Sequence, residues 1–459
     1  MLSIAPHKPE HYQIAIIGGG IAGVTLALAC EKYGIQYALF EARDSLAPAD
    51  GASIGLQANG LRILEQLGVY EEIERYATPV KIWRHLDEDG ELLCKTNAFS
   101  YYRSKFGYDS VVLDRQKLLS IMANKLRGLD GNNLVKLCCR VPSFQEDEEK
   151  AIVTTTDGTV ITADLLVGAD GVRSSVRKFI DSVQVEDHAE SDDYMSTQFA
   201  CAYGISPPMD AIVEGECFSV YREKASILSF TGKGGVVFWF VLEDLGETVP
   251  LSKSPRYTAK DVDAVCRSVA HIRVAPGVLF SDIYANRTVS MKIALEEGIA
   301  QTWNSARAVL VGDAAHKMVP NAAMGGNQAI ESVALLLNEL DGILQSPDSK
   351  IPADVLKAAL CRYSEQRKAR TSKIQNTAGM ICRTQMFPHG EKTSAAYQQL
   401  QSLTAADWLF RAFMEFIGAP SLNGITLTER GKFYDEALAS FQQRFSTQKY
   451  SNNKELVGI

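Results

Sequence analysis

The chain has 459 residues, of which 46% are hydrophobic and 22% are charged, and its formal net charge is −8. This composition is that of an ordinary globular protein, and the length suits two or three domains. Because the lysines and arginines are outnumbered and spread out, the sequence argues against nucleic acid or an anionic membrane as the main partner.

Nine cysteines are scattered along the chain, with no CxxC pair and no histidine spacing typical of a metal site. Reduced thiols in a cytoplasmic protein explain this pattern better than a disulfide framework or a zinc site. No secretory signal precedes the first predicted strand, and no segment reaches the roughly 20 apolar residues that a membrane helix needs. We therefore expect a cytoplasmic protein with no membrane span and no metal.

The first elements along the chain predict a βαβ unit. Residues 12–17 are apolar and rich in β-branched side chains, three glycines end this strand, residues 21–33 have a helical pattern, and residues 35–41 form the next strand. A unit of about 30 residues implies a parallel sheet. Further predicted elements are helices over 56–68 and 113–126 and a hairpin that turns at Asp157–Gly158.

The pattern changes between residues 195 and 295, where aromatic-rich alternating segments predict several antiparallel strands. The α/β pattern returns at 306, and from about 353 the chain is mostly helical up to a polar tail that we expect to be frayed. The predicted fold class is thus α/β: a discontinuous Rossmann-like nucleotide-binding domain (1–175 plus 300–350), an inserted mainly antiparallel β-sheet substrate domain (176–299), and a helical C-terminal region (351–459).

A glycine-rich turn follows the first strand. Gly18, Gly20 and Gly23 fit the GxGxxG pattern, and Glu41 stands at the end of the second strand. The first glycine permits a tight turn, the second lets a pyrophosphate approach the backbone, and the third allows helix and strand to pack closely. Glu41 is placed to accept hydrogen bonds from a ribose. The pattern predicts a dinucleotide site but does not distinguish NAD from FAD.

Two later strands end in a carboxylate. In LLVGADGVRSSVR (165–177) the predicted strand ends at Asp170–Gly171. In VLVGDAAHKMVPNAAMGGN (309–327) Asp313 comes directly after a predicted strand. With the glycine turn, these motifs resemble the single-component FAD-dependent monooxygenases, or flavoprotein aromatic hydroxylases, over roughly residues 12–345. The closest likeness is to fungal secondary-metabolite enzymes of the meroterpenoid and indole-alkaloid type.

The resemblance assigns the adenosine side of FAD first. It implies that Glu41 binds the adenosine ribose, that Gly55 lies near the flavin, and that Arg115 reaches the pyrophosphate or ribityl region. An arginine fork suits phosphate oxygens because it donates two parallel hydrogen bonds. From the residues alone, Arg115 could equally be a surface residue at a helix start, and Asp170, implied near FAD and the nicotinamide cofactor, could also be a helix N-cap.

On the flavin side, the resemblance implies that Asp313 binds the ribityl chain and that Pro320 walls the ring. Gly325, Gly326 and Asn327 would offer backbone amides to the flavin. An anionic reduced flavin would be favoured there by the start of the following helix. The sequence departs from the family pattern at three positions, which are Ala323 for Gly, Met324 for Gln and Ser332 for Asp. A methyl group at position 323 would restrict the backbone of this loop.

The implied reaction uses NAD(P)H as a transient co-substrate and O₂, through a flavin C4a-hydroperoxide, to hydroxylate or epoxidise an electron-rich group of a small molecule. Substrate-contact candidates are the aromatic residues of the middle strands, with Tyr221 as the catalytic hydroxyl. Each of them could equally be a core residue. The remaining candidates are Tyr203, Phe230, Phe238 and Trp239.

Three features bear on alternatives. Ala200 stands where some relatives carry an arginine that would stabilise a phenolate, which favours an alkene or indole substrate. His316 follows an acidic motif but is expected to be a packing or loop residue. The main alternative function is an FAD-binding redox protein, a reductase or sensor, without oxygenase activity. The sequence leaves the substrate, the choice of NADH or NADPH and the oligomeric state open.

Overall fold

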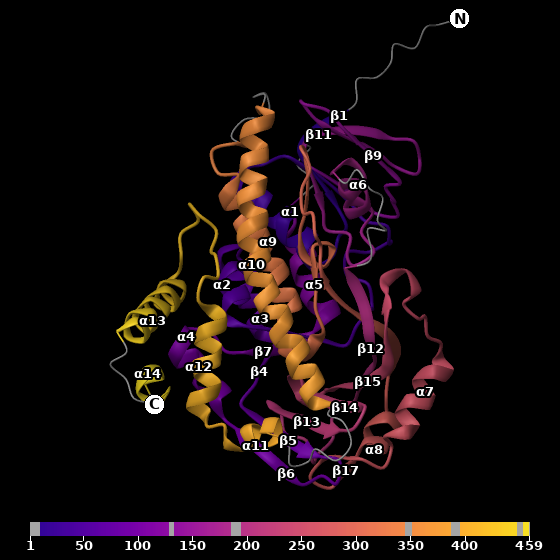
Figure 1. Cartoon of the computed structure of the whole chain (residues 1–459), viewed down its shortest axis with the longest axis vertical. Coiled ribbons are helices and arrows are strands. Elements are labelled where there is room, and N and C mark those ends of the chain that lie inside the picture. The colour runs from indigo at the N-terminus through magenta and orange to yellow at the C-terminus, as the bar shows by residue number, and fades with distance from the viewer. Residues whose placement is uncertain are drawn as a thin grey trace, which may run out of the picture.

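The structure is a computed structural model that describes residues 10–127, 133–184, 194–344, 351–386, 395–447 and 453–458. Two large sheets lie toward opposite ends of the molecule, and the long helix α10 runs between these ends (Figure 1). Across the described segments, every helix is too short or too polar to cross a membrane.

The first sheet is the predicted parallel one, extended at one side. Its strand order is β8-β2-β1-β11-β10-β9, and β19 pairs with β11. β1, β2, β8, β11 and β19 run parallel. β10 pairs antiparallel with β11, because the Asp157–Gly158 turn reverses the chain as predicted, and β9 pairs antiparallel with β10. The strands are β1 (Glu10–Ile17), β2 (Tyr37–Phe40), β8 (Leu134–Lys136), β9 (Ser143–Glu146), β10 (Ala151–Thr154), β11 (Val160–Gly168) and β19 (Ala308–Leu310).

Helices cover this sheet because its central strands are apolar on both faces. The helices α1 and α9 contact each other, and α9 also packs on α2. A small three-stranded sheet, in the order β3-β7-β4, lies beside them. The bounds are α1 (Ile21–Tyr33), α2 (Ala58–Gln66), α3 (Tyr70–Tyr76), α5 (Arg115–Lys125), α6 (Ser175–Gln184), α9 (Gly325–Glu339), β3 (Ser53–Leu56), β4 (Thr78–Pro79) and β7 (Val111–Asp114).

The second sheet has eight strands in the order β20-β18-β12-β15-β14-β13-β5-β6. The antiparallel strands predicted between 195 and 295 form its centre. The sheet also takes β5 and β6 from the first hundred residues, where no strand was predicted, and β5 pairs with β13 in parallel. The strands are β5 (Ile82–Asp87), β6 (Leu92–Thr96), β12 (Met195–Ser206), β13 (Glu216–Arg222), β14 (Ala225–Thr231), β15 (Val237–Pro250), β18 (Val289–Ile299) and β20 (His316–Lys317).

The two faces of the second sheet have different neighbours. Ala202, Phe218 and Trp239 belong to a core that includes residues of α7 (Ala259–Ser268) and α8 (Phe280–Ala285). Side chains alternate between faces along each strand, so Tyr203, Leu228 and Phe240 point the other way, toward the first sheet. This alternation turns one aromatic-rich face into the wall of a cavity between the two sheets.

The C-terminal region is helical, as predicted. α10 (Ala353–Gln385) contacts α9, which covers the first sheet, and β18 of the second sheet. The polar tail differs from the prediction, because α14 (Asn453–Val457) buries Leu456 and Val457 against α12 and α13. The remaining helices are α4 (Tyr102–Phe106), α11 (Ala395–Ser402), α12 (Ala405–Phe416) and α13 (Glu429–Ser446). The domain boundaries proposed from the sequence stay a prediction.

The packing around Trp239 gives a test of the second sheet. Gly204 and Ser229 lie opposite Trp239 on its two neighbouring strands. A Cβ at Gly204 would stand 2.2 Å from the indole and 2.4 Å from the Val289 carbonyl oxygen. We expect Gly204→Ala to lower the free energy of unfolding by about 3 kcal/mol, because neither the buried ring nor the backbone can give way.

The matched control is Ser229→Ala. The Ser229 hydroxyl is buried and has no hydrogen-bond partner within the described ranges, so its removal should change the free energy of unfolding by less than about 0.5 kcal/mol. Denaturant unfolding followed by circular dichroism measures both variants. Equal stability of the two variants would contradict this packing.

Candidate active site

Three parallel strands bring the predicted motifs to one edge of the first sheet. Ile17 of β1 is in register with Gly168 of β11, and Gly168 is in register with Leu310 of β19. The segments that follow these strands therefore lie side by side, although they are about 150 and 300 residues apart in sequence. This edge, outside the carboxyl ends of parallel strands, is where open α/β sheets bind ligands.

The glycine turn has the geometry that a pyrophosphate requires. Gly18 has φ +103°, and a Cβ there would stand 2.4 Å from the Ala169 carbonyl oxygen, while a Cβ at Gly23 would stand 1.9 Å from the Gly18 oxygen. These two glycines are needed for packing. Gly20 is different, because nothing lies within 4 Å of a Cβ built there and it lines the cavity. Open space at the start of α1 fits the pyrophosphate of FAD.

Glu41 is held against this turn. Its carboxylate accepts hydrogen bonds from the backbone amides of Gly19, at 2.6 Å, and Arg43, at 2.9 Å. These bonds fix the side chain beside the glycine turn and leave lone pairs for further donors. Binding of the adenosine ribose by Glu41 is compatible with this position and stays a prediction.

Asp170 has the structural role that was its alternative. Its carboxylate accepts hydrogen bonds from the Ser174 hydroxyl at 2.5 Å and from the Ser175 amide at 2.7 Å, so it caps the start of α6. Its neighbours Ala169 and Gly171 line the cavity. A role of Asp170 toward the cofactors therefore remains a prediction.

Arg115 is not a free surface residue. It lines the cavity, and its guanidinium donates to the carbonyl oxygen of Asp50 at 2.9 Å. The Arg115 side chain also packs on Gly51, where a Cβ would come within 2.9 Å of it. This anchoring leaves further guanidinium donors available on the cavity side, which suits the predicted contact with the cofactor's phosphates or ribityl chain.

Asp313 also lines the cavity, and it forms an ion pair with Lys317, four residues later, at 2.6 Å. Burial alone raises the pKa of the Asp313 carboxyl, but the Lys317 ammonium outweighs this effect and holds the pKa below its ordinary value. The carboxylate is therefore charged at neutral pH and can accept hydrogen bonds from ribityl hydroxyls.

Ala323 is fitted into a position that favours glycine. It has φ +52° and ψ +31°, which is the left-handed conformation, and its methyl group faces Gly55. A Cβ at Gly55 would stand 2.8 Å from the Ala323 Cβ. The alanine at position 323, where the family usually has glycine, therefore adopts a strained left-handed backbone conformation. Its methyl group has room because the facing residue on β3 is Gly55.

The buried Asn327 ties the same loop to β3. Its side chain accepts from the Gln57 amide at 3.0 Å and donates to the carbonyl oxygens of Gly55, at 3.1 Å, and Ala323, at 2.7 Å. The first α-helical bond of α9 runs from the Gln328 amide to Met324. The amides of Gly325, Gly326 and Asn327 therefore have no acceptor in the helix, and Gly325 and Gly326 line the cavity, as expected for a flavin cradle.

The cavity has a volume of about 390 Å³ and continues from this cradle to the second sheet. Pro320, beside the cradle, also lines it. The opposite wall is apolar and aromatic. The charged residues that line the cavity, Arg115, Asp313 and Lys317, all lie in segments of the cofactor cradle. The wall is formed by Val80, Trp83, Val111, Val112, Leu228, Phe230 and Phe240.

Of the aromatic candidates predicted from the sequence, Phe230 lies in this wall. Trp239 packs on the opposite face of the sheet, where its indole donates to Ser206 at 3.0 Å. Tyr203 accepts from the Gly51 amide at 3.2 Å, beside the cofactor cradle. Tyr221 is buried one step behind the cavity lining, with its hydroxyl 3.2 Å from His85 Nδ1. Its catalytic role stays a prediction that this position does not favour.

The sequence reasoning missed Trp83. Its indole donates to Ser219 at 2.7 Å and its ring lies against Phe99 and Phe230 with centroid distances of 5.5 Å, which fixes it at the cavity. The segment IWRHLD shows no regular alternation of apolar and polar residues, so the local pattern carried no signal for this strand. The pairing of this early strand with β13 could not be seen in the sequence.

His316 and Ser332 belong to a buried polar network behind the cradle. His316 Nε2 is 2.8 Å from the Ser332 hydroxyl, which also accepts from Arg367 at 3.1 Å. Burial, together with the nearby Arg367 charge, lowers the pKa of His316 to about 3. The imidazole is therefore neutral and structural, as expected, and Ser332 is a hydrogen-bonding residue of the core.

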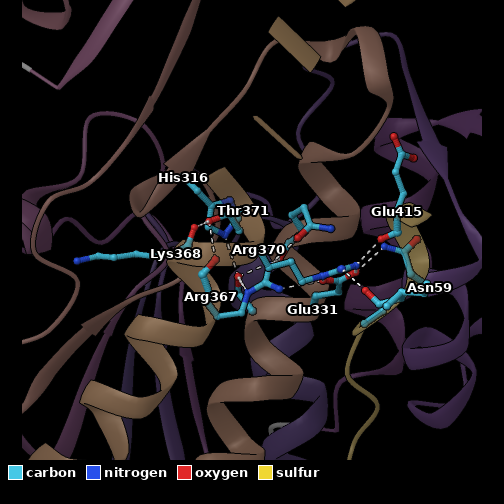
Figure 2. A network of polar contacts seen from close by, with 12 residues as sticks. Asn59, His316, Glu331, Arg367, Lys368, Arg370, Thr371 and Glu415 are labelled. Carbon is cyan, nitrogen blue, oxygen red and sulfur yellow. Dashed lines mark hydrogen bonds and ion pairs between the residues drawn. The ribbon is translucent and has the colours of Figure 1, made fainter. Parts of the chain in front are cut away.

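Glu331 is the centre of this network (Figure 2). Its fully buried carboxylate accepts from Arg367 at 2.8 Å, Arg370 at 2.6 Å and Asn59 at 2.6 Å. Burial alone would raise the pKa of Glu331, but the two arginines hold it at about 2. Arg370 continues to the carbonyl oxygens of Glu415 and Ile417 at the end of α12. The cradle helix α9 is thereby fixed to the C-terminal region.

Comparisons with known proteins agree with the fold and with FAD as the cofactor. The protein family described as "FAD binding domain" matches residues 11–376. The chain is 36% identical to the FAD-dependent monooxygenase olcE of Penicillium canescens over 82% of each chain. It is 33% identical to the FAD-dependent monooxygenase atmM of Aspergillus flavus, over 82% of this chain and 78% of that protein.

Solved structures share the fold at lower identity. HpxO of Klebsiella pneumoniae, complexed with FAD and uric acid, is 22% identical with a TM-score of 0.72, over 89% of this chain and 97% of that one. A salicylate hydroxylase in a substrate complex is also 22% identical, with a TM-score of 0.65 over 94% and 98% of the two chains.

The contact between Gly55 and Ala323 predicts a coupled pair of substitutions. Gly55→Ala should lower the free energy of unfolding by about 2 kcal/mol and weaken FAD binding about tenfold, because the two methyl groups would overlap and push the loop from the cradle. In the Ala323→Gly background the same substitution should cost less than about 0.5 kcal/mol. Denaturant unfolding and FAD titration measure this cycle, and purely additive effects would argue against the contact.

The buried ion network predicts a large loss of stability in Glu331→Gln. We expect the free energy of unfolding to fall by about 3–5 kcal/mol at pH 7, because two buried arginines lose their shared anion. The folded-state pKa of Glu331, about 2, lies below its ordinary value of 4.5. Its contribution is thus complete above pH 4.5 and is lost as the pH falls toward 2. The difference in free energy of unfolding between wild type and Glu331→Gln should be constant from pH 7 to 5 and should become smaller below pH 4.5.

The control for this substitution is Glu339→Gln. Glu339 of α9 also forms an ion pair with α10, at 2.8 Å from Arg362. The Arg362 side chain, however, is 54% exposed. An exposed pair contributes about 1 kcal/mol or less. Denaturant titrations at several pH values measure both variants, and comparable losses in the two would mean that burial of Glu331 does not matter.

Proposed function

Because the chain belongs to the FAD-binding-domain family and is an FAD-dependent monooxygenase, we propose that it uses NAD(P)H and O₂ to hydroxylate or epoxidise an electron-rich alkene, indole or aromatic group of a small secondary metabolite. The relatives are fungal proteins named as FAD-dependent monooxygenases, which supports an oxygenase reaction.

One observation carries the proposal. A single cavity has the cofactor cradle on one side and an apolar aromatic wall on the other. A cofactor held by Gly20, Arg115, Asp313 and the amides at the start of α9 would place its reactive ring facing this wall. A substrate lying between ring and wall would be positioned for reaction, which is a main contribution of an enzyme to such chemistry.

The residues of the cradle supply binding and electrostatics. When bound and reduced by NAD(P)H, FAD supplies the chemistry of O₂ activation and oxygen transfer. The chain's own contribution is to hold the cofactor by backbone amides and by Arg115 and Asp313. The positive end of α9 favours negative charge at the cradle. Trp83, Phe230 and Phe240 keep water from the substrate side, and a dry site limits wasteful side reactions.

The wall favours an uncharged substrate. Its lining residues carry no ionisable side chain, so a phenolate or carboxylate would be desolvated there without compensation. Ala200 does not carry the argument made from the sequence, because it pairs with Glu243 and so shares a face with Ala202 and Val241, away from the cavity. The preference for an alkene or indole group rests on the wall instead.

The test is an oxygenase assay with isotope. The purified FAD-loaded protein, incubated with NADPH or NADH, ¹⁸O₂ and a metabolite extract of its source organism, should consume O₂ faster when substrate is present. One ¹⁸O atom should appear in one uncharged product by mass spectrometry. FAD binding with negligible turnover and no labelled product would instead identify a redox protein without oxygenase activity.

A further inference from the structure

Lys317 is a cation in the cofactor cavity to which the sequence assigned no role. It lies in β20, four residues after Asp313 and three before Pro320, and it lines the cavity together with both. Its side chain is 24% exposed. Burial lowers the pKa of Lys317, but Asp313 and then Glu296 outweigh this effect and hold it above its ordinary value. The ammonium group is therefore charged at neutral pH.

The ammonium group has donors to spare. It has three N–H bonds, and within the described residues its one hydrogen-bond acceptor is the Asp313 carboxylate, at 2.6 Å. Glu296 influences it only at longer range, since its carboxylate pairs with Arg173 at 3.4 Å. Arg115, the other cation of the cavity, is anchored to Asp50. Two N–H bonds of Lys317 thus remain for a ligand of the cavity.

The position of Lys317 does not depend on its side chain. Its backbone is held by the pairing of β20 with β18, in which Lys317 is in register with Gly298. The side chain is therefore not required to connect the two sheets. Across the cradle from it, the amides of Gly325 and Gly326 at the start of α9 add a second source of positive potential.

Two positive groups that line one cavity point to a ligand that gains negative charge. Reduction of a flavin by two electrons and one proton, supplied here by a nicotinamide cofactor, adds one negative charge to it. We infer that Lys317 is a further cofactor-contacting residue, whose ammonium group stabilises the charge that bound FAD gains on reduction and so raises its reduction potential. This inference concerns the cofactor alone and does not depend on the proposed reaction.

The test is the reduction potential of the FAD-loaded protein, measured by reductive titration against a reference dye without O₂. In Lys317→Met the equilibrium between oxidised and reduced FAD should shift at least tenfold toward oxidised FAD. For a two-electron couple this shift lowers the reduction potential by about 30 mV. Lys317→Arg, which keeps the charge, should stay close to wild type. The matched control is Lys292→Met, because Lys292 forms a similar pair with Glu243, at 2.6 Å, on the helix-covered face of the same sheet.

A second variant tests the same charge in the opposite direction. Asp313→Asn removes the counter-ion of Lys317, so the potential of its bound FAD should rise above that of wild type. If Lys317 only neutralised or oriented Asp313, Lys317→Met would bind FAD more weakly at an unchanged potential, and that result would overturn the inference. The inference would also be overturned if the reduction potential of Lys317→Met matched that of wild type or of Lys292→Met. This test does not depend on whether the protein transfers oxygen to a substrate.

Discussion

The buried carboxylate of Glu331 is the interaction on which the arrangement of this protein depends. It lies on α9, whose first turn is the proposed flavin cradle, and it is bound by Arg367 and Arg370 of α10 and by Asn59 of α2 (Figure 2). A buried charge is tolerated only when it is paired and fully hydrogen-bonded. The three helices must therefore meet at this point, which fixes the cradle helix relative to the C-terminal region.

The same network reaches both sides of the cavity. Through Ser332 and His316 it supports the loop that carries Asp313 and Lys317. Through Arg370 it binds carbonyl oxygens at the end of α12, the helix whose Trp408 stacks on His85, with ring centroids 5.5 Å apart, behind the aromatic wall. One set of buried bonds thus supports the cofactor side and the substrate side together. This connection gives the C-terminal helices a role in the site although the described part of them contributes no lining residue.

The cavity itself is a consequence of sheet geometry. Parallel register brings three strand ends to one edge and so creates the cradle, while alternation in the second sheet directs one row of side chains toward α7 and α8 and the other toward the cavity. The chemistry follows from this opposition of a polar, amide-rich cradle and a dry aromatic wall. The charges that line the cavity, such as those of Asp313 and Lys317, lie on the side of the proposed cofactor cradle.

The local parts of this protein could be predicted from its sequence. The βαβ unit, the glycine turn, the strand ends at Asp170 and Asp313 and the helix after Gly325–Gly326 were all readable, because turn glycines and strand ends depend on residues close in sequence. Which side chains face the cavity could not be predicted in this way and became clear from the fold. The pairing of β5 with β13 brought in Trp83, sheet alternation removed Trp239 and Ala200, and the pairing of β20 with β18 gave Lys317 its place. Such choices depend on strand partners far away in sequence, and these are selected by burial in the whole fold rather than by local pattern.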